Sequence, residues 1–332
     1  MKFNQIITDL KNKIYYPVYF LTGEEPFYID EISSYIEKNV LSEDEKEFNQ
    51  TVIYGRETDV PTIVSYAKRF PMMSNYQVVI VKEAQQVNKI EELAPYIKNP
   101  LKSTLLVICY KYKKFDKRTT FANTIAKNSV LFNSAKLYDN KIPDWINDNL
   151  KQKGYSITPK ASFLLSEYLG TDLSKISNEI SKLIINLPEN TEITDVHIEE
   201  NIGISKDFNV FELQKTLGKK NVYKANQIIN YFAANPKDNP IVKIISILYI
   251  FFSKLLIYHQ LKDRSRNNIA SALSINPYFV YDYENAAKNY SFEKLAKIIS
   301  NLREYDVKSK GVGNISAKDG ELMKELVYKI LH

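Results

Sequence analysis

The sequence predicts an α/β fold with a parallel, doubly wound sheet, followed by a long helical region. Short apolar runs rich in β-branched residues alternate with amphipathic stretches up to about residue 140, the order that produces βα units. Strand signals almost vanish from Lys141 onward, and only 9 glycines occur in 332 residues, which favours helix. We therefore expect an α/β domain over residues 1–140, a small helical domain over 141–207 and a larger helical domain over 208–332.

Five strands are expected in the first domain, because the runs Val78–Val81 and Leu105–Ile108 are continuously apolar, as in strands covered on both faces. The expected strands are Val18–Leu21, Thr51–Tyr54, Gln77–Lys82, Thr104–Tyr110 and the weaker Val130–Phe132. Helical spacing predicts helices between them, one from Pro26, one capped by Asp59 and one over Ile90–Lys98.

The second part of the chain is expected to be helical, with Gly154 ending one helix and Thr158 and Asp172 capping the next two. Apolar residues nearly surround the stretch Ile241–Leu261, which predicts a buried central helix. Further helices are expected at Val210–Leu217, Val222–Ala234, Ile269–Leu273, Pro277–Asn289, Phe292–Val307 and Lys318–Leu331.

Composition narrows the function classes. A net charge of +6 permits contact with nucleic acid without demanding it. Cys109 lies in an apolar run and is expected to be a buried thiol, and three scattered histidines argue against a metal site. No signal peptide opens the chain, and Ile241–Ile257 is interrupted by lysines, so that it is judged too short and too charged to cross a bilayer. A soluble cytoplasmic protein is expected.

The turn Gly23-Glu24-Glu25-Pro26 follows the first expected strand, where many α/β proteins cradle a phosphate. A phosphate loop needs free backbone N–H groups, a lysine and a Ser or Thr hydroxyl. Here two carboxylates lie where the anion would bind, and Pro26 has no N–H. The turn is therefore interpreted as a degenerate phosphate-loop position that does not bind, and no cofactor is expected.

Four segments together carry a resemblance to a known family, the delta subunits of bacterial DNA polymerase III. They are Val18–Glu31, Leu169–Ile184, Asn209–Ile229 and Leu302–Gly311, with Ile176 and Tyr305 departing from the family pattern. The resemblance covers about Val18 to Leu331. It implies an α/β N-terminal AAA+-like domain (P-loop NTPase-type, degenerate), a small helical lid and an all-α collar used for oligomerisation.

The resemblance also implies a function. Such a subunit binds and opens the ring-shaped sliding clamp (the beta subunit), so that the clamp can be loaded onto primed DNA during replication. It does not hydrolyse ATP itself and has no catalytic residues. Its other partners would be the ATP-hydrolysing gamma/tau subunits and delta-prime, in a heteropentamer of the polymerase holoenzyme, with DNA held without sequence specificity and no membrane involved.

The family holds the clamp with a hydrophobic wedge just before a strand, in a pattern like P-x-F-S. The matching residues here are Phe70, Pro71, Met72 and Met73, with Met73 where Phe is common. Methionine fills irregular apolar pockets, so the change keeps the chemistry of the wedge. The alternative is that both methionines pack into their own domain.

Lysines near the C-terminus offer a possible contact to DNA phosphates. Lys308, Lys310 and Lys318 flank a glycine-containing loop and could touch phosphates without reading sequence; a solvated loop is the alternative. The basic run 111–118 interleaves aromatic and charged residues. It could serve as a subunit contact, a DNA contact or a solvated edge, and the solvated edge is favoured.

Two other function classes remain open. An ATP-hydrolysing AAA+ subunit would need a lysine in the phosphate loop and a carboxylate pair after a strand, whereas Val79–Val87 offers only Glu83. A general nucleic-acid-binding protein is suggested by the basic pI alone. Mixing the protein with sliding clamp and, separately, with ATP distinguishes the three classes.

Overall fold

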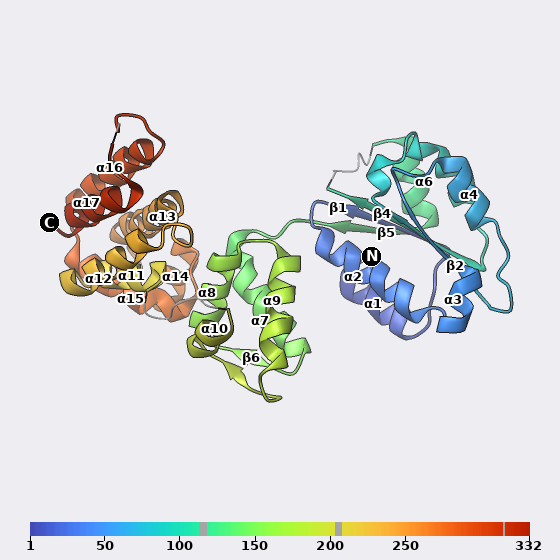
Figure 1. Ribbon diagram of the computed structural model, residues 1–332, viewed down its shortest axis with the longest axis horizontal. Helices are drawn as coiled ribbons and strands as arrows, with labels where there is room; N and C mark the ends of the chain where they lie inside the picture. The colour runs from blue at the N-terminus through green and yellow to red at the C-terminus, as the bar shows by residue number, and fades with distance from the viewer. Residues whose placement is uncertain (113–117, 203–207, 315) are drawn as a thin grey trace. The chain divides into compact units, whose positions relative to one another are not determined.

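The computed structural model describes residues 1–112, 118–202, 208–314 and 316–332. Its contacts divide the chain into two compact units, an α/β unit over Met1–Leu137 and a helical unit over Tyr138–His332 (Figure 1). The boundary expected at residue 207 lies outside the described residues. The division of the helical part into a lid and a collar therefore stays a prediction.

The α/β unit contains one sheet of five parallel strands in the order β2-β3-β4-β1-β5. The bounds are β1 Val18–Gly23, β2 Gln50–Tyr54, β3 Gln77–Lys82, β4 Thr104–Lys111 and β5 Val130–Ser134. All five expected strands are confirmed. The central strands β1, β3 and β4 are buried along almost their whole length, as expected for apolar runs covered by helices on both faces of a parallel sheet.

Helices cover both faces of this sheet (Figure 1). Along β1, Tyr19 and Leu21 point into one core together with α1 and α2, whereas Val18 and Phe20 point into the other core together with α4, α5 and α6. Cys109 is buried in the first core as expected. The helices are α1 Phe3–Lys11, α2 Pro26–Asn39, α3 Glu43–Asn49, α4 Val60–Ala67, α5 Ala94–Lys98 and α6 Thr120–Asn128.

Three of these helices, α1, α3 and α6, are not predicted from the sequence. They are only seven to nine residues long, too short for helical periodicity to stand out. The helix expected over Ile90–Lys98 is divided into a 3-10 turn, η2 (Ile90–Leu93), and α5. A further 3-10 turn, η1 (Ala84–Gln86), follows β3.

The second unit is built almost entirely from helices. Asp172 caps one of them by accepting a hydrogen bond from the Lys175 N–H at 3.0 Å, and Gly154 ends another at φ +83°, both as expected. The elements are η3 Asp139–Lys141, α7 Ile142–Gln152, α8 Pro159–Leu169, α9 Leu173–Ile185, α10 Asp195–Ile202, α11 Val210–Gly218, α12 Val222–Ala234, α13 Ile241–Gln260, α14 Arg266–Leu273, η4 Pro277–Phe279, α15 Val280–Asn289, α16 Phe292–Ser309 and α17 Asp319–Leu331.

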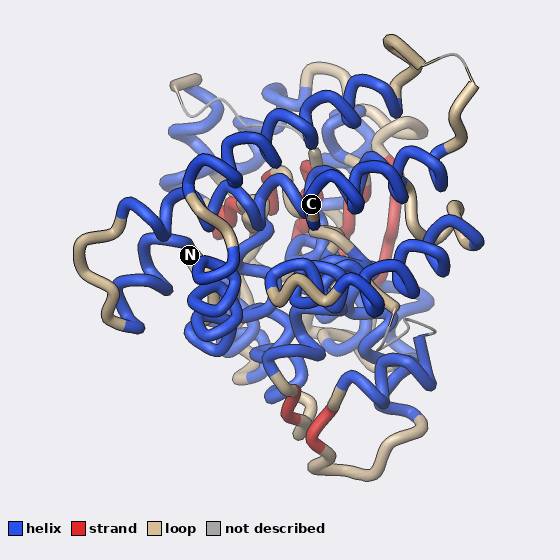
Figure 2. The backbone as a smooth tube through the Cα atoms, turned by 90° about the vertical axis from the view of Figure 1, so that its left-hand side faces the viewer, coloured by secondary structure: helices blue, strands red, loops and turns tan. Residues whose placement is uncertain are grey.

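Two short strands, β6 (Ser156–Ile157) and β7 (Glu192–Ile193), pair in parallel beside these helices and are drawn in red in Figure 2. The sequence did not predict them, because two residues are too few for any alternating pattern. Lys160 of α8 ion-pairs with Asp195 of α10 at 2.8 Å and with Glu212 of α11 at 3.1 Å. Phe163 of α8 packs on Phe211 of α11. These contacts join the segments on either side of residues 203–207 into one unit.

The long helix α13 corrects the membrane argument made from the sequence. By length and composition, α13 is long and apolar enough to cross a membrane, so the judgement that it is too short and too charged is wrong. Core helices of soluble proteins pass the same test. Eight of its residues are buried in the core of the unit. Its apolar residues do not all face inward, however, since Ile250 is 52% exposed.

Candidate functional site

The turn after β1 is tightly packed against the neighbouring strand. Gly23 has φ +137°, and a Cβ atom at this position would lie only 2.0 Å from the carbonyl oxygen of Ser134, at the end of β5. Two residues further on, Glu25 donates its backbone N–H to the same oxygen at 3.3 Å. Only glycine fits this backbone, because every other residue adds a Cβ atom.

The amino end of α2 is capped from within the turn. The carboxylate of Glu25 accepts a hydrogen bond from the Phe27 N–H at 3.1 Å, and the Glu25 residue is only 4% exposed. Pro26 occupies the first helical position. A buried carboxylate therefore lies where the helix dipole and free N–H groups would otherwise attract a phosphate.

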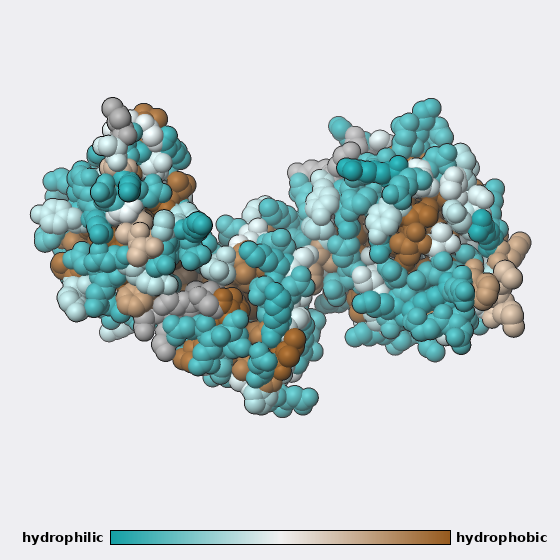
Figure 3. Space-filling model, in the orientation of Figure 1, coloured by the Kyte–Doolittle hydropathy of each residue, from teal (hydrophilic) through white to brown (hydrophobic). Residues whose placement is uncertain are grey.

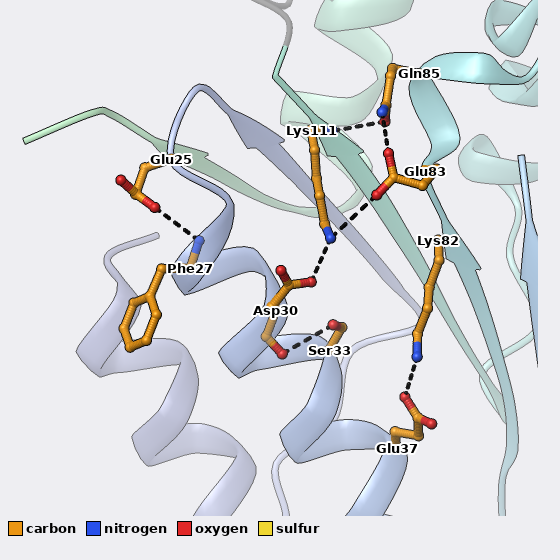
Figure 4. Close-up of polar contacts among 9 residues, drawn as sticks. All are labelled: Glu25, Phe27, Asp30, Ser33, Glu37, Lys82, Glu83, Gln85 and Lys111. Carbon is orange, nitrogen blue, oxygen red and sulfur yellow. Dashed lines mark hydrogen bonds and ion pairs between the residues drawn. The ribbon is translucent and has the colours of Figure 1, made fainter. Parts of the chain in front are cut away.

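A lysine lies beside this turn at the carboxyl end of β4 (Figure 4). The ammonium group of Lys111 lies 2.6 Å from Asp30 of α2 and 3.5 Å from Glu83, and its backbone N–H donates to Gln85 at 3.1 Å. Burial alone would lower the pKa of Lys111, but the two carboxylates outweigh that effect and raise the pKa. Lys111 therefore remains charged and ion-paired across the carboxyl edge of the sheet.

The role of Lys111 is not evident from the sequence. It belongs to the basic run 111–118, for which a solvated edge was favoured, yet its residue is only 8% exposed. That interpretation is wrong for Lys111. The signal that could have found it is its place directly after the buried run of β4. Residues 113–117 of the run lie outside the described residues, so the interpretation of those positions is not tested.

The loop between α4 and β3 differs sharply from the turn after β1. Phe70 is 75% exposed, Met72 62% and Met73 103%, while Pro71 is half-buried. In Figure 3 a light brown cluster projects where Figure 1 draws this loop, at the right-hand edge of the α/β unit. Met72 and Met73 therefore do not pack into their own domain, which was the alternative considered from the sequence.

The backbone of this loop is also unusual. Met73 has φ +52°, in the left-handed region that a residue with a side chain enters only at a cost in free energy. Strained backbone of this kind is concentrated at sites of binding and catalysis. The loop thus presents large apolar side chains to solvent, and at Met73 the backbone conformation disfavours any side chain.

The lysines proposed for DNA contact lie near the end of α16 and the start of α17. Lys308 is paired with Glu304 at 2.6 Å and lies over the ring of Tyr305, and Lys310 is paired with Asp306 at 2.7 Å. Lys318 is exposed. Ion pairs of this i to i+4 kind at a protein surface contribute little to stability, so phosphates could replace them. A role in DNA contact stays a prediction.

No group of three or more His, Cys, Asp or Glu side chains suited to a metal ion occurs among the residues that the structure describes. The Lys111 cluster brings together two carboxylates, Asp30 and Glu83, with a bound ammonium group between them. These three side chains therefore form an internal ion-pair network.

The fold defines a class of protein. A five-stranded parallel sheet in the order β2-β3-β4-β1-β5, followed by a helical C-terminal region, makes this an α/β protein with a helical extension, the fold class expected from the sequence. Residues 19–135 match the family described as "DNA polymerase III, delta subunit", and residues 207–326 match its C-terminal domain. The chain belongs to the DNA polymerase III delta subunit family and is thus a clamp-loader subunit that serves DNA replication.

Individual relatives agree with this assignment. The DNA polymerase III subunit delta of Bacillus subtilis (strain 168) is 27% identical over 329 residues, covering 96% of this chain and 93% of the relative. A probable DNA polymerase III subunit delta of Aquifex aeolicus (strain VF5) is 24% identical, covering 88% and 86%. The solved structure of the Bacillus subtilis DNA clamp loader delta protein shares the fold, with a TM-score of 0.55, 23% identity and 99% of each chain covered.

Proposed function

We propose that this clamp-loader subunit binds the sliding clamp (the beta subunit) through Phe70, Pro71, Met72 and Met73, and that this binding opens the clamp for loading onto primed DNA. The observation that carries the proposal is the exposure of three large apolar side chains, those of Phe70, Met72 and Met73, on one loop whose backbone is left-handed at Met73. Exposing such side chains to water is unfavourable. A group of exposed apolar side chains therefore marks a surface that a partner covers.

Burial of the exposed side chains of this loop could supply enough free energy to open an interface of the clamp. Burial of one methionine side chain is worth about 1.5–3 kcal/mol, and anchors at the centre of an interface reach about 2 kcal/mol or more. Two adjacent methionines and a phenylalanine can therefore supply enough free energy to compete with contacts within a partner. We propose that they do so at one interface of the clamp ring.

Replacing both Met72 and Met73 with alanine tests the proposal. Clamp affinity should fall about 100- to 1,000-fold, equivalent to about 3–4 kcal/mol, while the unfolding curve stays that of the wild type. Ile185→Ala removes another highly exposed apolar side chain, in α9 of the other unit, and serves as the matched control. A double variant that binds clamp like the wild type would refute the proposal.

We also propose that the chain does not hydrolyse ATP. Support comes from the Glu25 carboxylate at the amino end of α2 and from the Lys111 pairs with Asp30 and Glu83 at the same edge of the sheet. Equilibrium dialysis with labelled ATP and magnesium should show no micromolar binding. Binding that is lost on changing Gly23–Phe27 would instead favour the ATP-hydrolysing alternative.

The helical unit is proposed to join the ATP-hydrolysing gamma/tau subunits and delta-prime in a heteropentamer. Support comes from one face of α13, where apolar side chains spaced seven or eight residues apart are each at least 41% exposed: Val242, Tyr249, Ile250 and Ile257. Charged replacements there should prevent co-elution with the other subunits while clamp binding persists. Unchanged assembly would contradict this role.

The complex is proposed to act in the cytoplasm, without a membrane, and to hold primed DNA without reading its sequence. Binding through phosphates predicts an affinity that falls steeply with salt. If the chain bound DNA tightly but ignored the clamp, the general nucleic-acid-binding alternative would replace the proposal.

A further inference from the structure

Asn49 lies directly behind the Phe70–Met73 loop. It is the last residue of α3 and immediately precedes β2. In the sheet, Gln50 of β2 lies beside Val78 of β3, so the amino ends of the two strands are neighbours. The chain that leads into β3, which carries Met72 and Met73, therefore arrives next to Asn49.

The side chain of Asn49 binds the loop through its backbone. Its Oδ1 atom accepts a hydrogen bond from the Met72 N–H at 2.7 Å, and its Nδ2 atom donates to the Met72 carbonyl oxygen at 2.9 Å. Nδ2 also donates to the Glu45 carbonyl oxygen at 3.1 Å, which fixes the amide to its own helix. The Asn49 residue is completely buried, at 0% exposure.

These two bonds act on Met72 as a neighbouring strand would, because they engage both its donor and its acceptor. Met73 follows at φ +52° with its side chain fully in solvent. None of the residues described in its own unit covers that side chain to hold the conformation. The hydrogen bonds of Asn49 instead fix the backbone of Met72, the residue just before the left-handed Met73.

We infer that Asn49 is a positioning residue that presets the loop so that Met72 and Met73 meet the clamp without first reorganising. The inference rests on the proposed function. A preorganised loop binds more tightly because less conformational entropy is lost on association. Asparagine suits the position, since aspartate lacks the donor for the Met72 carbonyl and alanine lacks both groups.

Asn49→Ala should weaken clamp binding about tenfold, because the loop then samples conformations that do not bind. The amide proton of Met72 should also exchange faster in the variant. In the background that already lacks the Met72 and Met73 side chains, Asn49→Ala should change affinity by no more than about twofold. A structural role alone would not produce this dependence on the two methionines.

Thr119→Ala is the matched control for lost stability. Thr119 caps α6, a helix of the same unit that packs beside β5, at the opposite edge of the sheet from β2. It should lower stability and leave clamp affinity unchanged. If Asn49→Ala retains wild-type affinity while the double methionine variant loses it, the inference is wrong and the proposed function stands. If the double variant also binds normally, both are overturned.

If the alanine variant does not fold, Asn49→Asp is the second variant that tests the inference. At neutral pH its carboxylate would face the carbonyl oxygens of Met72 and Glu45, and clamp binding should weaken by at least the same tenfold factor. Lowering the pH protonates the new carboxyl group, which can then donate again, so affinity relative to the wild type should recover. Wild-type affinity for this variant at neutral pH would overturn the inference.

Discussion

Two loops of the α/β unit lie at opposite edges of the same parallel sheet and have opposite properties. The turn Gly23–Pro26 follows β1 at the carboxyl edge, and the loop Phe70–Met73 precedes β3 at the amino edge. The first is closed by Glu25 and packed on Ser134. The second exposes Phe70, Met72 and Met73.

Open α/β sheets usually bind their ligands at the carboxyl edge, where strand ends and helix amino ends converge. In this chain that edge holds an internal carboxylate cap and the ion pairs of Lys111. The exposed apolar side chains of Phe70, Met72 and Met73 are found at the other edge. The difference teaches that the edge where such sheets usually bind a ligand can be filled by the chain's own side chains, while exposed apolar side chains lie at the other ends of the strands.

The closed turn should be the more sensitive of the two to substitution. Gly23→Ala places a Cβ atom 2.0 Å from the Ser134 carbonyl oxygen, so we expect a loss of about 3–5 kcal/mol of unfolding free energy, or no folding. Urea unfolding measures the change. Gly154→Ala is the matched control, because Gly154 also has positive φ but a Cβ atom added there would meet no described atom within 4 Å. Equal losses for the two variants would disprove the close packing of the turn.

The open loop should show a conflict between stability and binding. At φ +52° glycine is favoured over alanine by about 1 kcal/mol, so Met73→Gly should be more stable than Met73→Ala by that amount. Both variants should lose clamp affinity, since both lack the side chain. Denaturation and clamp titration of the pair test this. A glycine variant that is less stable than the alanine variant would argue against strain at Met73.

The smallest effect is expected from the pH dependence of stability due to Glu45, a residue of α3 whose carbonyl oxygen accepts a hydrogen bond from Asn49. The Ser42 backbone N–H, then the hydroxyl groups of Ser74 and Ser42, lower the pKa of Glu45 below its ordinary value of 4.5. A depressed pKa stabilises the fold above pH 4.5, and this contribution is lost as the pH falls through the folded-state pKa.

Unfolding of wild type and Glu45→Gln should therefore differ slightly above pH 4.5 and converge below the folded-state pKa of Glu45. Glu47→Gln, which changes an exposed residue of the same helix, is the control. A difference that grows on acidification would contradict the sign of this linkage.

Much of the fold could be predicted from sequence, because its signals are local. The strand run Val78–Val81 is apolar without interruption, and Asp59 and Asp172 cap helices by bonds to residues three positions later. The helices α1, α3 and α6 and the strand pair β6 and β7 were missed. They are short, and contacts from distant parts of the chain stabilise them.

The sequence by itself determined the parallel α/β order, the altered chemistry of Gly23–Pro26 and the position of the apolar loop before β3. Only the tertiary structure decided that Met72 and Met73 lie in solvent, that Lys111 is buried between Asp30 and Glu83, and that Asn49 binds Met72. The reason is physical. Strand and cap signals act within a few residues, whereas Asn49 meets Met72 across 23 residues and only after β2 and β3 pair in register.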